Sequence, residues 1–125
     1  MKKNRIAIVL ISSIAFLFTS ACFLFSPQRG PLKFNPDNLP EAQAGVPYDV
    51  KISITQNVTP AGQFSISEGV LPKGMTLEKL QSEDKARISG TPEEAGTYEF
   101  TIFLWCYGTN VNRQSGDMKY TIVVR

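Results

Sequence analysis

Apolar and polar residues alternate along several short stretches of this chain. In residues 48–54, YDVKISI, every second side chain is apolar, and the pattern recurs in residues 64–66, 98–104 and 120–124. A period of two predicts strands that bury one face. Short strands are also expected at residues 75–77 and 86–89, and no window supports a long helix. The pattern therefore predicts an all-β protein, a two-sheet sandwich of about seven strands.

Glycine, proline and tyrosine residues in the middle of the chain separate these strands. The positions to which we assign a structural role are Leu71, Pro72, Gly74, Gly90, Pro92, Gly96 and Tyr98. Pro72 and Gly74 bracket a turn that a regular strand could not contain. Gly90 and Pro92 end a strand where the chain crosses between sheets. Tyr98 has the position of a tyrosine corner, whose hydroxyl bonds to the backbone of the preceding loop.

Five motifs follow one another in a specific order and spacing. They are AGVPY at 44–48, FSIS at 64–67, LPKGMTL at 71–77, ISGTP at 88–92 and AGTYEF at 95–100. Together they resemble the putative Ig domain family of bacterial surface proteins, which is related to dystroglycan-type cadherin-like domains. The resemblance covers about residues 34–125. It implies an immunoglobulin-like β-sandwich that acts as an extracellular spacer or adhesion module.

The first 21 residues have the form of a secretory signal peptide. A positively charged start is followed by an uncharged, mostly apolar run at residues 6–18 and by small residues at 19–21. Ser20, Ala21 and Cys22 resemble the lipobox of bacterial lipoproteins, although Thr19 stands where that pattern prefers an aliphatic residue. The resemblance implies that the Cys22 thiol carries the lipid and becomes the new N-terminus. We expect residues 22–33 to form a lipid-anchored tether and residues 34–125 to form the Ig-like domain.

Two other interpretations of the leader remain open. Residues 6–25 carry no charge and are long enough to cross a bilayer as an uncleaved anchor, and simple secretion is the third possibility. All three place the domain outside the cytoplasm, and lipidation would attach it to the cell membrane or the outer membrane. The leader holds three of the 13 basic residues, so its removal changes the net charge from +2 to −1. A nearly neutral chain without a basic cluster is not expected to bind nucleic acid.

The composition also argues against an enzyme or a metalloprotein. The chain contains no histidine, which is the commonest general base and metal ligand, and only two cysteines. Asp37 and Asn38 supply too few oxygens for calcium. Glu93 and Glu94 are adjacent and point to opposite sides of an extended chain. We therefore expect no catalytic residues, no metal and no cofactor.

The strand at 98–104 and the residues after it present the candidate binding surface. Phe103, Trp105 and Tyr107 share one parity on the face where solvent is expected, and aromatic residues at that spacing can form a flat stacking platform for a sugar ring or a partner protein. Alternatively, they pack under the loop at 108–117 or against a neighbouring strand. Cys106 has the opposite, inward parity, which favours a buried thiol over a disulfide to Cys22 or to a second chain.

These observations predict a non-catalytic, lipid-anchored protein of the cell envelope. Its partners are expected to be the membrane, through the lipid, and an envelope protein or a glycan. The Ig-like module would have a structural or protein-interaction role at the membrane surface. The alternative is a carbohydrate-binding module that uses Phe103, Trp105 and Tyr107.

Overall fold

The computed structural model of the protein describes residues 30–108 and 113–125 and contains seven strands there. They are β1 (Lys33–Asn35), β2 (Tyr48–Thr55), β3 (Ala61–Gly69), β4 (Met75–Lys79), β5 (Lys85–Gly90), β6 (Gly96–Cys106) and β7 (Ser115–Val124). The expected signal peptide, Cys22 and most of the expected tether lie outside the described residues. No helix in the described part of the chain is long and apolar enough to span a membrane.

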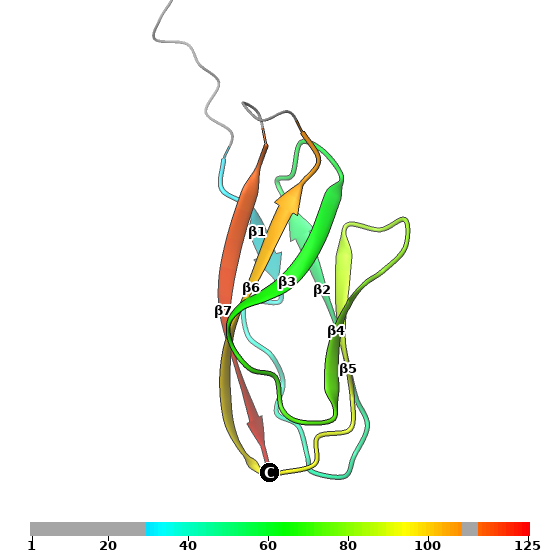
Figure 1. Cartoon of the computed structure of the whole chain (residues 1–125), viewed down its shortest axis with the longest axis vertical. Helices are drawn as coiled ribbons and strands as arrows, with labels where there is room; N and C mark the ends of the chain where they lie inside the picture. Colours follow the sequence, from blue (N-terminus) through cyan, green and yellow to red (C-terminus); the bar gives the residue numbers. More distant parts are fainter. Residues whose placement is uncertain (1–29, 109–112) are drawn as a thin grey trace, which may run out of the picture.

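The strands form two sheets that lie face to face (Figure 1). One sheet has the order β1-β2-β5-β4 and the other has the order β3-β6-β7, and neighbouring strands run antiparallel. Two sheets in this arrangement bury the inner faces of their strands against each other. The predicted all-β, immunoglobulin-like sandwich of about seven strands is confirmed.

The alternation in β2 decides which of its faces enters the core. Ile52 and Ile54 are buried, whereas Asp49 and Lys51 point to solvent. Residues two apart on a strand lie on the same face, so one apolar set is enough to fix the orientation of the whole strand. β5 lies beside β2 in the same sheet and adds the buried Ala86, which pairs with Ile52.

β6 lies at the centre of the second sheet and contributes several fully buried side chains to the core. Phe100, Ile102, Leu104 and Cys106 are at most 1% exposed, which agrees with the inward parity expected for Cys106. On β7, Tyr120 pairs with Phe100 and is also buried. Complete burial of one such apolar side chain contributes about 1.5–3 kcal/mol.

The packed part of the chain extends beyond the stretches that alternate. Leu32, which the sequence places in the tether, belongs to the core, and β1 follows it at Lys33–Asn35. β7 begins at Ser115, five residues before the alternating stretch at 120–124. Ser115 and the polar residues after it extend the strand because the long β6 gives their backbone groups hydrogen-bonding partners.

The expected turn residues lie where the strands of the first sheet end. Gly74 and Gly90 both have positive φ, which is the conformation that glycine adopts at low cost. Pro72 and Pro92 are fully buried beside them. The hydroxyl of Tyr98 donates to the carbonyl oxygen of Glu94 at 3.2 Å, which is the bond expected of a tyrosine corner.

The buried side chain of Gln114 holds together the end of the sandwich at which the described chain begins. Its Nε2 donates to the carbonyl oxygens of Gly30, at 2.8 Å, and Gln56, at 3.1 Å. Its Oε1 accepts a hydrogen bond from the backbone amide of Val58 at 3.1 Å. In Figure 1 this end lies at the top, where β6 ends and β7 begins, and the C-terminus lies at the opposite end.

Candidate functional site

Trp105 and Tyr107 lie together at the Gln114 end of the sandwich. Trp105 is on the outer face of β6, where it pairs with Gln63 of β3 and Ser115 of β7, and Tyr107 follows the strand. Their ring centroids are 5.2 Å apart, with an angle of 80° between the planes. The two rings therefore meet edge to face and form a corner, which differs from the flat platform considered as one interpretation of the sequence.

Gly62 allows Trp105 to lie close to the sheet. A Cβ atom at Gly62 would come within 2.3 Å of two carbon atoms of the Trp105 six-membered ring. Only a residue without a side chain leaves room for the ring there. The strand below thus determines how Trp105 lies, and the ring is left half-buried.

The backbone of Tyr107 is held by the loop that precedes β3. Its amide donates to the carbonyl oxygen of Pro60 at 3.0 Å, and its carbonyl oxygen accepts from the Thr59 hydroxyl at 2.5 Å. The side chain remains 54% exposed. An aromatic ring on a fixed backbone can meet a partner with little loss of conformational entropy.

Two charged side chains attach the β4–β5 hairpin to the start of β3. Lys79 Nζ donates to the carbonyl oxygen of Ala61 at 2.6 Å. The backbone amide of Ala61 donates to Asp84 Oδ1, also at 2.6 Å, and Asn57 Nδ2 donates to Asp84 Oδ2 at 2.8 Å. Hydrogen bonds to ionised groups are stronger than neutral ones, so this contact fixes the hairpin beside Tyr107.

Two cations complete the site. Lys79 Nζ is 5.8 Å from the centre of the Tyr107 ring, and the guanidinium carbon of Arg113 is 5.2 Å from the centre of the Trp105 ring. Both distances are within the range of attraction between a cation and an aromatic face. We refer to Trp105, Tyr107, Lys79 and Arg113 as the aromatic–basic corner.

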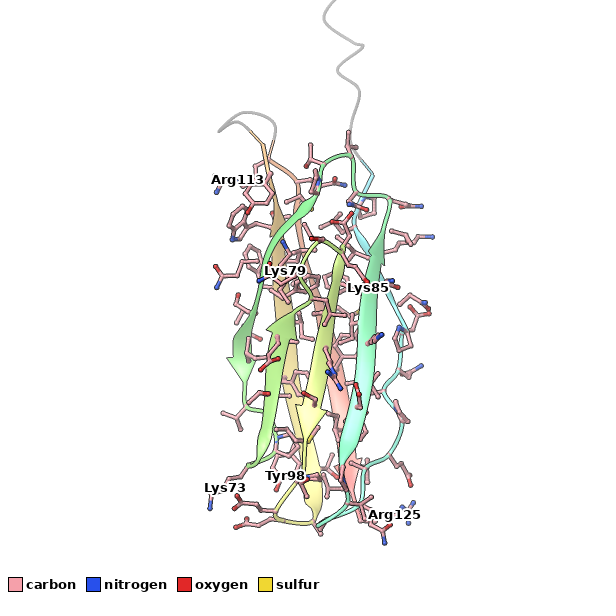
Figure 2. The ribbon with its side chains drawn as sticks, turned by 90° about the vertical axis from the view of Figure 1, so that its right-hand side faces the viewer. Lys73, Lys79, Lys85, Tyr98, Arg113 and Arg125 are labelled. Atoms are coloured by element: carbon pink, nitrogen blue, oxygen red, sulfur yellow. The ribbon has the colours of Figure 1, made fainter. Side chains whose placement is uncertain are left out.

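An open pocket of about 360 Å³ lies against the corner. Its lining joins β3, β6 and the β4–β5 hairpin, and consists of Gly62, Gln63, Lys79, Gln81, Ser82, Trp105 and Tyr107. Figure 2 shows Arg113 near one end of the molecule and Lys79 nearer the middle, with Lys73, Tyr98 and Arg125 at the other end. The residues that line the pocket therefore supply two aromatic rings together with amide, hydroxyl and ammonium groups.

The sequence identified the rings but missed the other half of the corner. Phe103 shares a face with Trp105 and is half-buried, yet it does not line the pocket. Lys79 comes from the other sheet, and no local spacing connects it with Trp105. Arg113 belongs to the loop at 108–117. In the second interpretation of the sequence, the aromatic residues pack under this loop.

Neither the second cysteine nor the acidic side chains form a reactive or metal-binding site among the described residues. Cys106 is a free thiol with no exposure, and burial raises its pKa, with a smaller contribution from the charge of Asp84. A thiol that is buried and protonated is a poor nucleophile. Within residues 30–108 and 113–125, no three His, Cys, Asp or Glu side chains gather closely enough to hold a metal ion.

No curated protein matches the chain by sequence. Among solved structures, the SrpA adhesin R347E mutant from Streptococcus sanguinis is similar, with a TM-score of 0.55, 11% identity and coverage of 78% of this chain and 57% of that chain. An endo-fucoidan hydrolase from glycoside hydrolase family 107 has a TM-score of 0.55 and 22% identity, over 81% of this chain and 14% of that chain. The chain thus spans only part of these neighbours, which it resembles in fold.

The sequence itself gives the family. The model of the family described as Putative Ig domain matches residues 30–125, which is most of the chain. The matched region contains all seven strands, and it begins at Gly30, where Gln114 holds the chain. This chain is a member of the Putative Ig domain family.

Proposed function

We propose that this protein is a non-catalytic lipoprotein of the cell envelope, in which one Ig-like domain serves as an interaction or spacing module at the membrane surface. The observation that carries the proposal is the order of segments in the chain. A leader that ends in Ser20 and Ala21 is followed by Cys22, and the family domain begins eight positions after this cysteine, at Gly30. Such a short connection suits a module that works close to its anchor.

The buried polar side chains of the domain serve its own hydrogen bonding. In the part of the chain that the structure describes, every buried side-chain nitrogen and oxygen has a hydrogen-bond partner. Catalytic sites typically keep reactive groups with strongly perturbed pKa values in a cleft. The residues around the aromatic–basic corner are instead suited to binding, with an envelope protein or a glycan as the partner.

The anchor is tested by intact-mass measurement of the protein isolated from membranes. We expect a mass that lacks residues 1–21 and includes the lipid on Cys22. Cys22→Ser should abolish the lipid mass, because the thiol is the acceptor. Cys106→Ala, which changes the only other cysteine, should leave the lipid mass unchanged. A protein that still begins at Met1 would contradict the proposal and favour an uncleaved membrane anchor.

Carbohydrate binding is the second candidate, and the pocket beside Trp105 favours it. Sugar-binding sites place the apolar face of a sugar ring on an aromatic side chain and bind its hydroxyl groups through polar side chains. The pocket offers the Trp105 and Tyr107 rings together with the side chains of Gln63, Gln81 and Ser82. This candidate concerns the ligand of the module and is compatible with the lipid anchor.

We expect Trp105→Ala to weaken glycan binding at least tenfold, because it removes the largest apolar surface of the pocket. Trp105 is the only tryptophan, so binding by this variant is measured by calorimetry, whereas Trp105 fluorescence reports on the wild type and on Tyr107→Ala. Phe103→Ala is the matched control on the same strand, and it should bind as the wild type does. A wild-type protein that responds to no glycan in a broad panel would rule out this candidate.

A further inference from the structure

The two cations of the aromatic–basic corner have no acidic partner. Most other described cations, such as Lys73 and Arg87, form ion pairs with a neighbouring carboxylate. Among the described residues, no carboxylate oxygen lies within 4.0 Å of a side-chain nitrogen of Lys79 or Arg113. Each of these two positive charges is held against an aromatic ring instead.

The acidic residues near the pocket are already occupied. Asp84 accepts hydrogen bonds at both oxygens, from the Ala61 amide and from Asn57. Glu83 pairs with Lys85 at 2.9 Å. The positive charge of Lys79 is therefore not neutralised by a direct contact, and it faces the pocket that it lines.

Lys79 is held in place and still has donors to offer. An ammonium group carries three N–H donors, and the carbonyl oxygen of Ala61 takes one of them. Two donors remain for a ligand beside Tyr107. Because the β4–β5 hairpin fixes the side chain, little conformational entropy is lost when a ligand binds.

Arg113 offers a second cation from a fixed backbone position. The next residue, Gln114, is buried and bonded to Gly30, Gln56 and Val58. The guanidinium group has five N–H donors in one plane and recognises carboxylate or sulfate oxygens with two parallel bonds. Its position over the Trp105 ring, which lines the pocket, places these donors at the border of the pocket.

We propose that the aromatic–basic corner binds an acidic sugar unit, with a carboxylate or sulfate group held by Lys79 and Arg113. This inference rests on the carbohydrate-binding candidate above and specifies its ligand class. The sugar ring packs against Tyr107 and the accessible part of Trp105, its hydroxyl groups bond to the polar side chains of the pocket, and its negative charge is met by the two cations. A neutral sugar makes the first two contacts but lacks the third.

The test compares matched ligands on the full-length product, purified in a neutral detergent without a sugar headgroup. A trigalacturonate, a sulfated trisaccharide and a neutral galactose trisaccharide are titrated while Trp105 fluorescence is followed. We expect saturable binding of at least one acidic ligand, at least tenfold tighter than that of the neutral one, because hydrogen bonds to charged groups are the stronger kind. Added salt should weaken acidic binding and leave neutral binding unchanged.

Variants locate the charge recognition. Lys79→Met and Arg113→Gln should each reduce the preference for the acidic ligand several-fold, with thermal unfolding used to confirm that both remain folded. Lys51→Met removes one positive charge from the exposed face of β2, outside the pocket lining, and should keep the full preference. An equal loss in Lys51→Met would overturn the proposal, because it would show a dependence on net charge alone.

The outcomes separate this inference from the function on which it rests. Equal affinity for acidic and neutral trisaccharides would overturn the acidic-sugar proposal and leave the carbohydrate-binding candidate standing. No binding of any of the three ligands, or of a broader panel, would overturn both.

Discussion

Replacing Gly90 by alanine is expected to lower the free energy of unfolding by about 3 kcal/mol or more, a large share of the stability of a small domain. Gly90 has a φ of 131°, and a Cβ atom there would lie 2.1 Å from the carbonyl oxygen of Gly74 and 2.8 Å from the Cα of Met75. Gly90 pairs with Tyr48 of β2 and Met75 of β4. Since the obstacles are backbone atoms, relief requires the strands to separate.

Chemical denaturation followed by circular dichroism measures this loss, and Gly45→Ala provides the control. Gly45 also has a positive φ, 77°, but a Cβ atom there would meet nothing within 4 Å. Its substitution should cost only the conformational term, about 1–2 kcal/mol. If Gly90→Ala costs no more than Gly45→Ala, the close contact between β4 and β5 is not the reason for the glycine.

The second large effect is a loss of stability at alkaline pH. Burial raises the pKa of Tyr48 to about 12, and burial together with the charge of Asp37 raises that of Tyr120 to about 12. Each hydroxyl donates to a backbone carbonyl oxygen, at Pro40 and Pro36 respectively, and needs its proton to do so. The usual pKa of a tyrosine side chain is 10.0, so between about pH 10 and 12 the unfolded chain ionises before the folded one.

The sign follows from the order of these pKa values. Below about pH 10 both tyrosines are protonated in the folded and unfolded states, and their contribution is fully present. As the pH rises from about 10 to 12, only the unfolded state loses these protons, so stability falls. At 1.36 kcal/mol per pKa unit, the two tyrosines together account for up to about 5 kcal/mol.

Denaturation at a series of pH values, with phenolate absorbance to follow ionisation, measures this fall. Tyr48→Phe and Tyr120→Phe should each flatten the curve between about pH 10 and 12, at a cost of about 1 kcal/mol at neutral pH for the lost hydrogen bond. In the double variant, the two tyrosines should no longer contribute to the fall in the free energy of unfolding between about pH 10 and 12. A double variant that loses stability as steeply as the wild type would assign the alkaline transition to other groups.

The sequence predicted the fold because its strongest signals are local. Alternation in residues 48–54 fixed which face of β2 is buried, and parity placed Cys106 in the core. The short β1 and the polar first half of β7 could not be predicted in this way. They become strands because neighbouring strands supply hydrogen-bonding partners, which is a tertiary effect that overrides weak local propensity.

The candidate site was predictable only as far as one strand extends. Parity grouped Trp105 with Tyr107, but the angle between their rings depends on Gly62 and on the loop before β3. Lys79 reaches the site through the packing of the β4–β5 hairpin on the other sheet. Contacts between segments far apart in the sequence leave no period or motif, so a single sequence contains no direct signal for them.

The described chain begins at the same end of the sandwich as the aromatic–basic corner, and this limits what the protein can meet. Gly30 lies eight positions after Cys22, and an extended chain spans at most about 3.6 Å per residue. With a lipid on Cys22, the Gln114 end can therefore rise no more than about 30 Å above the bilayer. The aromatic–basic corner could then bind only molecules that lie at the membrane surface or can diffuse to it. A longer connection between Cys22 and the domain would change which ligands the corner can reach. The affinity of the corner for each ligand would stay the same.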